Sequence, residues 1–185
     1  MKPDHAAYRR AARLVLAAAF ILMLPLLAMQ LTDEVRWGVA DFLVAGALLV
    51  GTGLLFELAL RKSGHIAYRA AAGVALAAAL ILVWLNLAVG VIGTENDRAN
   101  LMYLGVLAVA AIGVVVARFR PQGMARALFA TAVAQASVAA VALSFGLGAP
   151  ASGPLEILAL NGFFVALFAG SALLFRYAAR EQAPG

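Results

Sequence analysis

The side chains with the most chemistry to offer in this sequence are a few carboxylates and amides within or beside long apolar runs. Asp41 and Asn100 stand near the starts of two such runs, and Asn161 stands further into a third. Polar side chains are costly inside a membrane, so they are the first candidates for function. The internal repeat described below aligns these three residues at one equivalent position. A ring of one carboxylate and two amides on the outer side would bind a cation or a polar solute.

Helix capping is the alternative interpretation of the same three residues. Asp and Asn are preferred where a helix begins, because their side chains accept hydrogen bonds from the first free backbone amides. This preference favours capping for Asp41 and Asn100. Asn161 is expected to lie one or two turns inside its helix, where a cap is not needed.

Other polar side chains are expected to hold helices together. Asn86 and Gln135 lie within apolar runs, where an amide hydrogen bond between helices contributes about 1 kcal/mol in lipid. Contact with a substrate is the alternative for both residues. Glu57 stands four residues before Arg61, which is the favoured order for an ion pair on one helix face. We interpret Glu57 and Arg61 as structural.

Catalysis by the common enzyme chemistries is not supported by the residues present. The sequence contains no Cys, which excludes thiolate nucleophiles and Cys-ligated metals. His5 and His65 are far apart in the sequence and lack the helical spacing of a metal or haem pair. We therefore predict no catalytic residue, no metal site and no cofactor, and an enzyme is the weakest functional class.

The composition indicates that lipid is the solvent of this chain. Of its 185 residues, 65% are hydrophobic and only 12% are charged, and the mean hydropathy is +0.97. A soluble domain is closer to half apolar and a quarter charged. The net charge of +5 does not indicate nucleic-acid binding, because the basic residues stand at the ends of apolar runs and form no separate patch.

Six apolar runs are long enough, or nearly so, to cross the hydrocarbon core as helices. We place them at residues 12–31, 39–60, 70–93, 100–117, 126–147 and 155–176. The connections between them are short, and a β-barrel would need shorter, alternating segments. The sequence therefore predicts an all-α, polytopic membrane protein with six transmembrane helices.

Basic residues are distributed very unevenly among the connections. Twelve of the 14 Lys and Arg residues lie at the two termini or in the second and fourth connections, which leaves Arg36 and Arg98 for the other side. The positive-inside rule then places both termini in the cytoplasm of a bacterial inner membrane. The aromatic residues are expected at the two lipid–water interfaces: Tyr8, Tyr68 and Tyr177 on the inner side, Trp37 and Tyr103 on the outer side. Most acidic residues fall on the outer side: Asp33, Glu34, Asp41, Glu95, Asp97 and Glu156.

An internal repeat relates distant parts of the chain. Residues 7–30 and 67–90 match at 13 of 24 positions, and 51–61 and 170–180 match at 6 of 11. Such self-similarity indicates a duplicated unit. We divide a single membrane domain, residues 1–185, into tandem helical hairpins at 7–62, 67–122 and 125–181, related by pseudo-threefold symmetry. Because each hairpin has two spans, all three share one orientation.

Small residues spaced four apart are expected to face the interior of this bundle, since they let helix backbones approach in lipid. The expected stripes are Ala71/Ala75/Ala79, Ala132/Ala136/Ala140 and Gly162/Ala166/Gly170.

The stretches DEVRWGVADFLVAGALLVGTGLLFELALRK (33–62) and VWLNLAVGVIGTENDRANLMY (83–103) resemble a family of small bacterial inner-membrane proteins to which no activity is assigned. The architecture is also similar to that of the acid-resistance membrane proteins, which are built from two-helix repeats. The resemblance implies a membrane location and supplies no catalytic motif.

Two functional interpretations remain open. The first is a non-catalytic accessory or structural role, including a role in envelope stress, with the lipid bilayer, another membrane protein or a second copy as partner. The second is transport of a small solute or ion past Asp41, Asn100 and Asn161. Short connections and few polar residues within the spans favour the accessory role.

Overall fold

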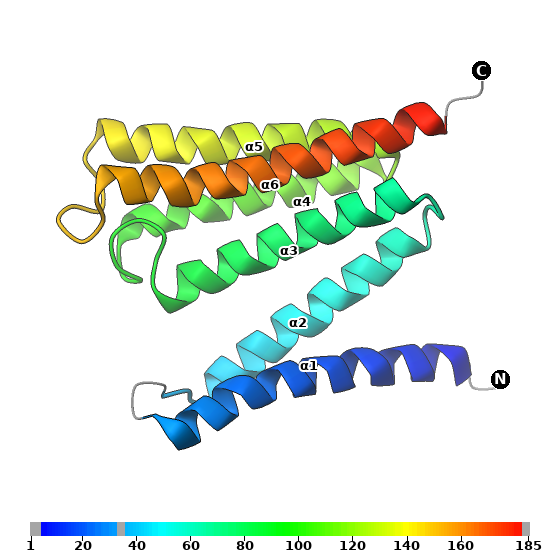
Figure 1. Ribbon diagram of the computed structural model, residues 1–185, viewed down its shortest axis with the longest axis horizontal. Coiled ribbons are helices and arrows are strands. Elements are labelled where there is room, and N and C mark those ends of the chain that lie inside the picture. The colour runs from blue at the N-terminus through cyan, green and yellow to red at the C-terminus, as the bar shows by residue number, and fades with distance from the viewer. Residues whose placement is uncertain (1–4, 33–35, 183–185) are drawn as a thin grey trace. The chain divides into compact units, whose positions relative to one another are not determined.

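The computed structural model describes residues 5–32 and 36–182, with side chains from residue 12 onward. Its helices are α1 (His5–Leu31), α2 (Val39–Leu60), α3 (Ile66–Ala88), the 3₁₀ helix η1 (Arg98–Leu101), α4 (Met102–Ala117), α5 (Pro121–Ser144) and α6 (Pro154–Glu181) (Figure 1). Among the described residues, six helices are long and apolar enough to cross a membrane. The prediction of an all-α chain with six helices able to span a membrane is confirmed for the described residues.

Some of the sequence predictions fall outside the described part of the chain. These are the ones for Lys2, Asp33 and Glu34, and for the side chains of His5, Tyr8, Arg9 and Arg10.

Local sequence explains where the helices begin. His65 is the N-cap of α3, and its Nδ1 accepts a hydrogen bond of 3.3 Å from the amide of Ala67. α5 and α6 both begin with a proline, Pro121 and Pro154, whose missing N–H has no role in the first turn of a helix. These signals place the starts of α3 and α5 four and five residues before the predicted ones, at 70 and 126.

The predicted end of the third span, at residue 93, is wrong. α3 ends at Ala88, because Gly90 and Gly93 adopt left-handed backbone conformations with φ of +78° and +71°. Val91 and Ile92 between them are buried, at 1% and 0% exposure. The apolar run therefore continues into a loop that folds back onto the protein. The fifth span likewise ends at Ser144, before the predicted residue 147.

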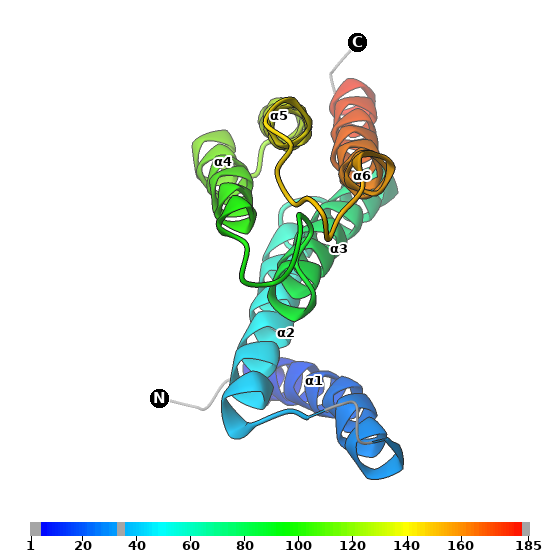
Figure 2. The same ribbon diagram turned by 90° about the vertical axis from the view of Figure 1, so that its left-hand side faces the viewer.

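The chain divides into two compact units. We call residues 1–58 the two-helix unit and residues 59–185 the four-helix unit. In the four-helix unit, α5 packs against both α4 and α6, and α3 packs along α6 (Figure 2). The tandem three-hairpin symmetry and the single domain over 1–185 stay predictions.

The core of the four-helix unit is aromatic. Phe164, Phe168 and Phe175 lie on one face of α6 and are at most 1% exposed. Tyr68 of α3 is fully buried and meets the Phe175 ring edge-on, with ring centroids 4.9 Å apart. This ring contact joins α3 to α6, and the small side chains of Ala71 and Ala72 on α3 are also buried.

The predicted small-residue stripes are wrong for α5 and α6. Ala136 and Ala140 of α5, and Gly162 and Ala166 of α6, are exposed. The buried face of α6 is instead occupied by Asn161 and the phenylalanines, and that of α5 by Thr131, Gln135 and Val138 among others. Spacing alone finds a face of a helix, and side-chain volume and polarity decide which face turns inward. Ala71 in the first stripe is fully buried, as expected.

The two-helix unit buries little of its own surface. Ala18 and Ala45 are its buried apolar residues within the described part. A Cβ added to Gly53 would lie 2.7 Å from a Leu14 methyl group, so α1 and α2 approach closely there. Elsewhere large apolar side chains point outward, as at Phe20, which is 72% exposed.

Candidate functional site

Asn161 joins three helices of the four-helix unit. It lies in the second turn of α6 and is 1% exposed. Its Oδ1 accepts hydrogen bonds from the Tyr103 hydroxyl of α4 at 3.0 Å and from Nε2 of Gln135 of α5 at 2.9 Å. The prediction that Asn161 lies one or two turns inside its helix is confirmed. We call Tyr103, Gln135 and Asn161 the amide hub.

The backbone fixes the orientation of the Asn161 amide. Its Nδ2 donates to the carbonyl of Ile157, one turn earlier in α6, at 2.8 Å. A carbonyl only accepts, so Nδ2 must face it, and Oδ1 is left to accept from α4 and α5. The interhelical hydrogen bond predicted for Gln135 is confirmed.

One buried acceptor of the amide hub has no partner. The Oε1 atom of Gln135 forms no hydrogen bond among the described residues, although the side chain is 0% exposed. Two other buried hydroxyls of α5 and α6 are paired: Thr131 donates to the Ala127 carbonyl at 2.9 Å, and Ser171 donates to the Ala71 carbonyl at 2.7 Å. The Ser171 bond links α6 to α3.

Asn100 organises the loop between α3 and η1. Its Oδ1 accepts from the amides of Val91 and Ile92, both at 3.0 Å. Its Nδ2 donates to the carbonyls of Ile92 at 3.0 Å and Thr94 at 2.7 Å. The Asn100 side chain thereby supplies hydrogen-bond partners for backbone groups of the buried loop that would otherwise have none.

The capping prediction is wrong for Asn100. Asp97 caps η1, and its Oδ1 accepts from the Ala99 amide at 2.9 Å. Asn86 of α3 reaches the same region, where its Nδ2 donates to the Asn100 backbone carbonyl at 3.4 Å. Asn86 therefore links α3 to η1, in the structural manner that we favoured for it.

Two connecting loops lock together beside Asn100. The amide of Gly93 donates to Oγ of Ser152 at 3.0 Å. A Cβ on Gly148 would lie 2.9 Å from the Gly93 nitrogen, so only glycine allows this approach. The loop after α3 and the loop after α5 consequently cover one end of the four-helix unit together.

Asp41 belongs to the two-helix unit. Its Oδ2 accepts from the Gly38 amide at 2.7 Å, three residues earlier and just before α2 begins. This is the backward bond of a capping box, so the capping prediction is confirmed for Asp41. Within the four-helix unit Asn100 and Asn161 each have their own partners, and the predicted ring of three residues stays a prediction. Glu57 stands in the last turn of α2 with Arg61 just after it, and their pairing also stays a prediction.

Sequence reasoning missed Tyr103 as part of the site. Tyr103 and Tyr68 are buried in the protein, at 1% and 0% exposure, and their expected depth at the lipid–water interfaces stays a prediction. The Tyr68 hydroxyl donates to the Phe119 carbonyl at 2.9 Å, and the Tyr103 hydroxyl serves the amide hub. The spacing of Tyr103 one helical turn after Asn100 was the available signal, because it places the phenol near the polar end of α4.

The amide hub can donate and accept hydrogen bonds but contains no ionisable carboxylate, imidazole or amine. No group of three or more His, Cys, Asp or Glu residues in the described part of the chain could hold a metal ion. The chemistry at the hub is therefore that of helix association and of neutral hydrogen bonding.

Comparisons with known proteins give no further guidance. No family model, curated protein or solved structure matches the chain.

Proposed function

We propose that this chain is a non-catalytic, multi-pass protein of a bacterial inner membrane with an accessory or structural role. The observation that carries the proposal is that nearly all polar side chains buried in the four-helix unit have hydrogen-bond partners within the protein. Asn161 and Asn100 use both their donors and their acceptors within the protein. A permeating solute would need some of these groups to be free.

Surface exposure supports the same proposal. Phe20 of α1 and Leu43 of α2 are 72% and 69% exposed, and other large apolar residues of these helices are similarly open. In a membrane, exposed apolar faces of a helix contact lipid or other helices, and packing between helices does not depend on the hydrophobic effect there. We infer that the two-helix unit provides the contact with a partner membrane protein.

Photo-crosslinking in native membranes tests the accessory role. A photoreactive amino acid at Phe20 is expected to give one discrete protein adduct, with mass above that of the chain. Val116 of α4 is 75% exposed and serves as the matched control, at which no discrete adduct is expected. Lipid adducts alone at both positions would contradict the proposal, as would a lone, monodisperse protein after extraction in mild detergent.

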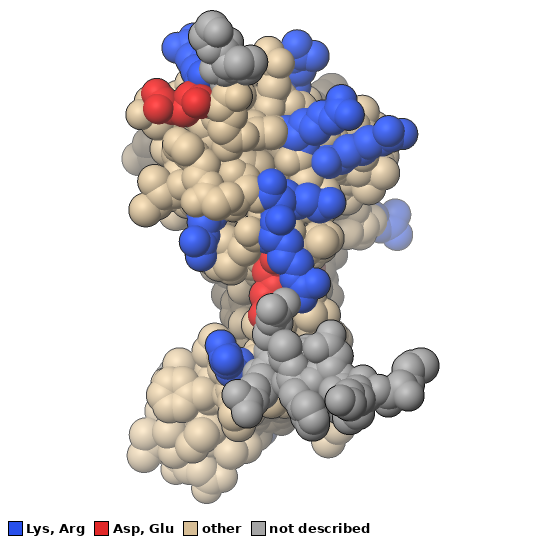
Figure 3. Space-filling view, turned by 90° about the vertical axis from the view of Figure 1, so that its right-hand side faces the viewer, with Lys and Arg blue, Asp and Glu red and all other residues tan. Residues whose placement is uncertain are grey.

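The charges of the four-helix unit support an orientation with both termini in the cytoplasm. The start of α3, the turn between α4 and α5 and the end of α6 lie at one end of the helices (Figure 1), and basic side chains gather there (Figure 3). The opposite end has Arg98 beside Glu95 and Asp97. The residues at the basic end are Arg61, Lys62, Arg69, Arg118, Arg120, Arg126, Arg176 and Arg180.

Cysteine labelling tests this orientation directly, since the chain has no Cys of its own. We expect Gly64→Cys to resist a membrane-impermeant maleimide added to intact cells and Asn96→Cys to react with it. The reverse pattern would overturn the orientation, and reaction at both positions would overturn the assignment of α3 as a membrane span.

Transport is the second candidate, and the unpartnered Oε1 of Gln135 is the observation that favours it. A free acceptor at hydrocarbon depth could receive a hydrogen bond from a polar solute or from water. Solute or ion flux in proteoliposomes that falls in both Gln135→Leu and Asp41→Asn would support transport. The absence of flux above that of empty vesicles would leave the accessory role.

A further inference from the structure

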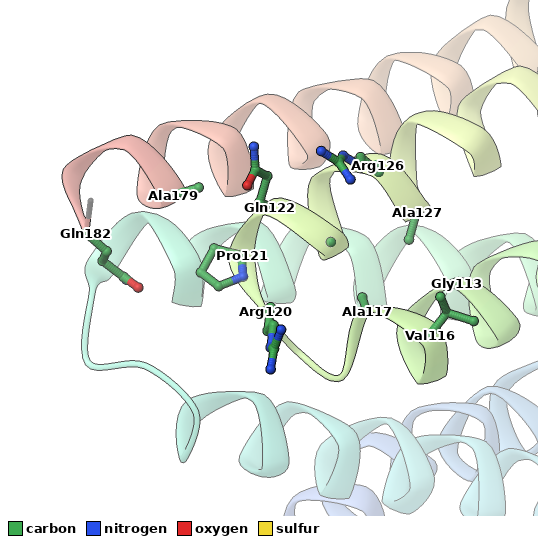
Figure 4. A pocket seen from close by; sticks show the side chains of 11 residues that line it. Gly113, Val116, Ala117, Arg120, Pro121, Gln122, Arg126, Ala127, Ala179 and Gln182 are labelled. Atoms are coloured by element: carbon green, nitrogen blue, oxygen red, sulfur yellow. The ribbon is translucent and has the colours of Figure 1, made fainter. Parts of the chain in front are cut away.

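The second feature of the four-helix unit is a cavity at its basic end. It has a volume of about 750 Å³ and is lined by residues of α4, of the turn into α5 with its first two turns, and of α6. Figure 4 shows the lining side chains, and we call this cavity the basic groove. The side chains that matter for its chemistry are Ala117, Arg120, Gln122, Arg126, Ala179 and Gln182.

Small residues create the groove. A Cβ on Gly113 would lie 2.6 Å from the Ala127 Cβ, and a Cβ on Gly123 would lie 2.9 Å from the Ala117 Cβ. α4 and α5 therefore almost touch along this line. Ala179 on α6 adds a third short side chain to the wall. The space above these residues is open because nothing on the three helices is large enough to fill it.

Polar groups stand on the groove in a defined order. Arg120 is the N-cap residue of α5, and no side chain caps that helix by a hydrogen bond. Figure 4 shows Arg126 directed back along α5 toward Gln122, with Gln182 at the end of α6 and Arg120 on the turn. Among the described residues, neither guanidinium has a hydrogen-bond or ion-pair partner. Both are exposed and free to bind an anion.

The turn that presents Arg120 is held firmly. Arg118 and Phe119 both adopt left-handed conformations, with φ of +48° and +60°. Tyr68 donates to the Phe119 carbonyl at 2.9 Å, and Lys62 Nζ lies 5.9 Å from the centre of the Phe119 ring. These contacts fix the geometry of the turn without using Arg120 or Arg126.

We propose that the basic groove binds the phosphate headgroup of an anionic phospholipid, with the start of an acyl chain on its apolar wall. The Arg126 guanidinium, which extends toward Gln122 (Figure 4), matches a phosphate oxygen, and Arg120 on the turn adds a second positive charge at the same end of the groove. Apolar lining continues to Val116 and Gly113 of α4, which lie about one to two helical turns from the turn that carries Arg120. A free phosphate ion would contact only the polar end of the groove. A phospholipid would contact the polar end with its headgroup and the apolar wall with its acyl chain, so the presence of an apolar wall favours a lipid.

The position of the groove agrees with this occupant. Arg120, Arg126 and Gln182 lie at the ends of membrane-spanning helices, at the depth where lipid headgroups are found. Basic pockets between transmembrane helices on the cytoplasmic side are suited to anionic lipids. The one acidic residue near these helix ends, Glu181, does not line the groove.

Native mass spectrometry of the full chain, delipidated in detergent, provides the test. The protein is titrated with phosphatidylglycerol and, separately, with phosphatidylcholine of the same acyl chains. We expect clear preference for phosphatidylglycerol. Arg120→Gln/Arg126→Gln should weaken that binding by about thirtyfold, because each basic group near an anionic lipid contributes about 1 kcal/mol.

Two further variants separate the groove from general charge. Arg176→Gln/Arg180→Gln also removes two positive charges at the basic end, but from the part of α6 outside the groove. Lipid binding should change less than about threefold, since exposed charges beyond the site are screened. Ala179→Leu keeps every charge and fills the wall, and should reduce lipid binding as strongly as the double arginine variant. It also keeps the proposal testable if that variant does not fold.

The proposal is overturned by any of three results. Equal affinity for phosphatidylglycerol and phosphatidylcholine would show that the groove does not distinguish an anionic headgroup from a zwitterionic one. An unchanged affinity in both Arg120→Gln/Arg126→Gln and Ala179→Leu would place lipid binding elsewhere. Displacement of phosphatidylglycerol by millimolar sn-glycerol 3-phosphate would assign the groove to a soluble phosphate, and failure to displace it supports a lipid.

Discussion

Replacing Asn161 by leucine should destabilise the protein through the amide hub. The substitution removes three hydrogen bonds, from Tyr103, from Gln135 and to the Ile157 carbonyl. Bonds between membrane helices average about 0.6 kcal/mol each, which gives about 2 kcal/mol for the three. Leucine has the same branching as asparagine but is larger, so any overpacking in the core adds to the loss of the hydrogen bonds.

The donors left behind add to this cost. The Tyr103 hydroxyl and the Gln135 amide group would remain buried without Asn161, and a stranded buried donor costs about 1–3 kcal/mol. The unpartnered Gln135 Oε1 can accept from the Tyr103 hydroxyl after a small rotation, which recovers part of the loss. We therefore expect Asn161→Leu to lower the free energy of unfolding by about 2–4 kcal/mol.

A double-mutant cycle separates the two terms. Tyr103→Phe alone removes one bond of 3.0 Å and should cost about 0.5–1.5 kcal/mol. In the Asn161→Leu background the same change should cost less, because the hydroxyl has already lost its Asn161 partner. The coupling would be measured by SDS titration in mixed micelles, followed by far-UV circular dichroism.

The control is Ser137→Ala on the exposed face of α5. Its hydroxyl donates to the Val133 carbonyl in the same helix at 2.9 Å, and such a bond contributes little to association between helices. Its free energy of unfolding should change by less than about 0.5 kcal/mol. If Asn161→Leu falls in that same small range, the hub does not hold the three helices together and the reasoning is refuted.

Three other perturbations have defined outcomes. Asn100→Ala removes four bonds to the loop backbone, and amide hydrogen exchange over residues 90–97 should rise at least tenfold, which corresponds to about 1.4 kcal/mol. Gly113→Ala should lower thermal stability in detergent, because its Cβ would lie 2.6 Å from that of Ala127, whereas Gly105→Ala, with open space around it, should not. Tyr68→Phe loses a 2.9 Å bond to the α4–α5 turn and should cost about 1 kcal/mol in the same SDS titration.

The number and type of the elements could be read from the sequence. Apolar runs of about 20 residues have few stable forms in lipid other than helices, because each backbone group must be paired within its own segment. The bounds predicted for the second span, 39–60, agree with α2 (Val39–Leu60). Residues with local partners were also predictable: Asp41 bonds three residues away, and its capping role depends only on the start of α2.

Residues whose partners are distant in the sequence were not predictable in the same way. Tyr103 and Asn161 are 58 positions apart, and no spacing rule links them. Asn100 was predicted to be a cap because Asn is favoured at helix starts. The N-cap of η1 is instead Asp97, three residues earlier, and the Asn100 side chain bonds to the loop before η1. Local preference identified the right region and the wrong partner.

The inward face of each helix was decided only by tertiary packing. In a chain so rich in alanine, small residues recur on every face, and so the stripes on α5 and α6 carried little information. The face of α6 that turns toward the core instead carries Phe164, Phe168 and Phe175, because large rings gain more contacts when they fill the space between helices. The sequence by itself determined a six-span helical membrane chain with a basic end, since lipid solvation and charge act on each segment separately. The amide hub and the basic groove exist only in the tertiary structure, because each needs side chains that packing brings together from three helices.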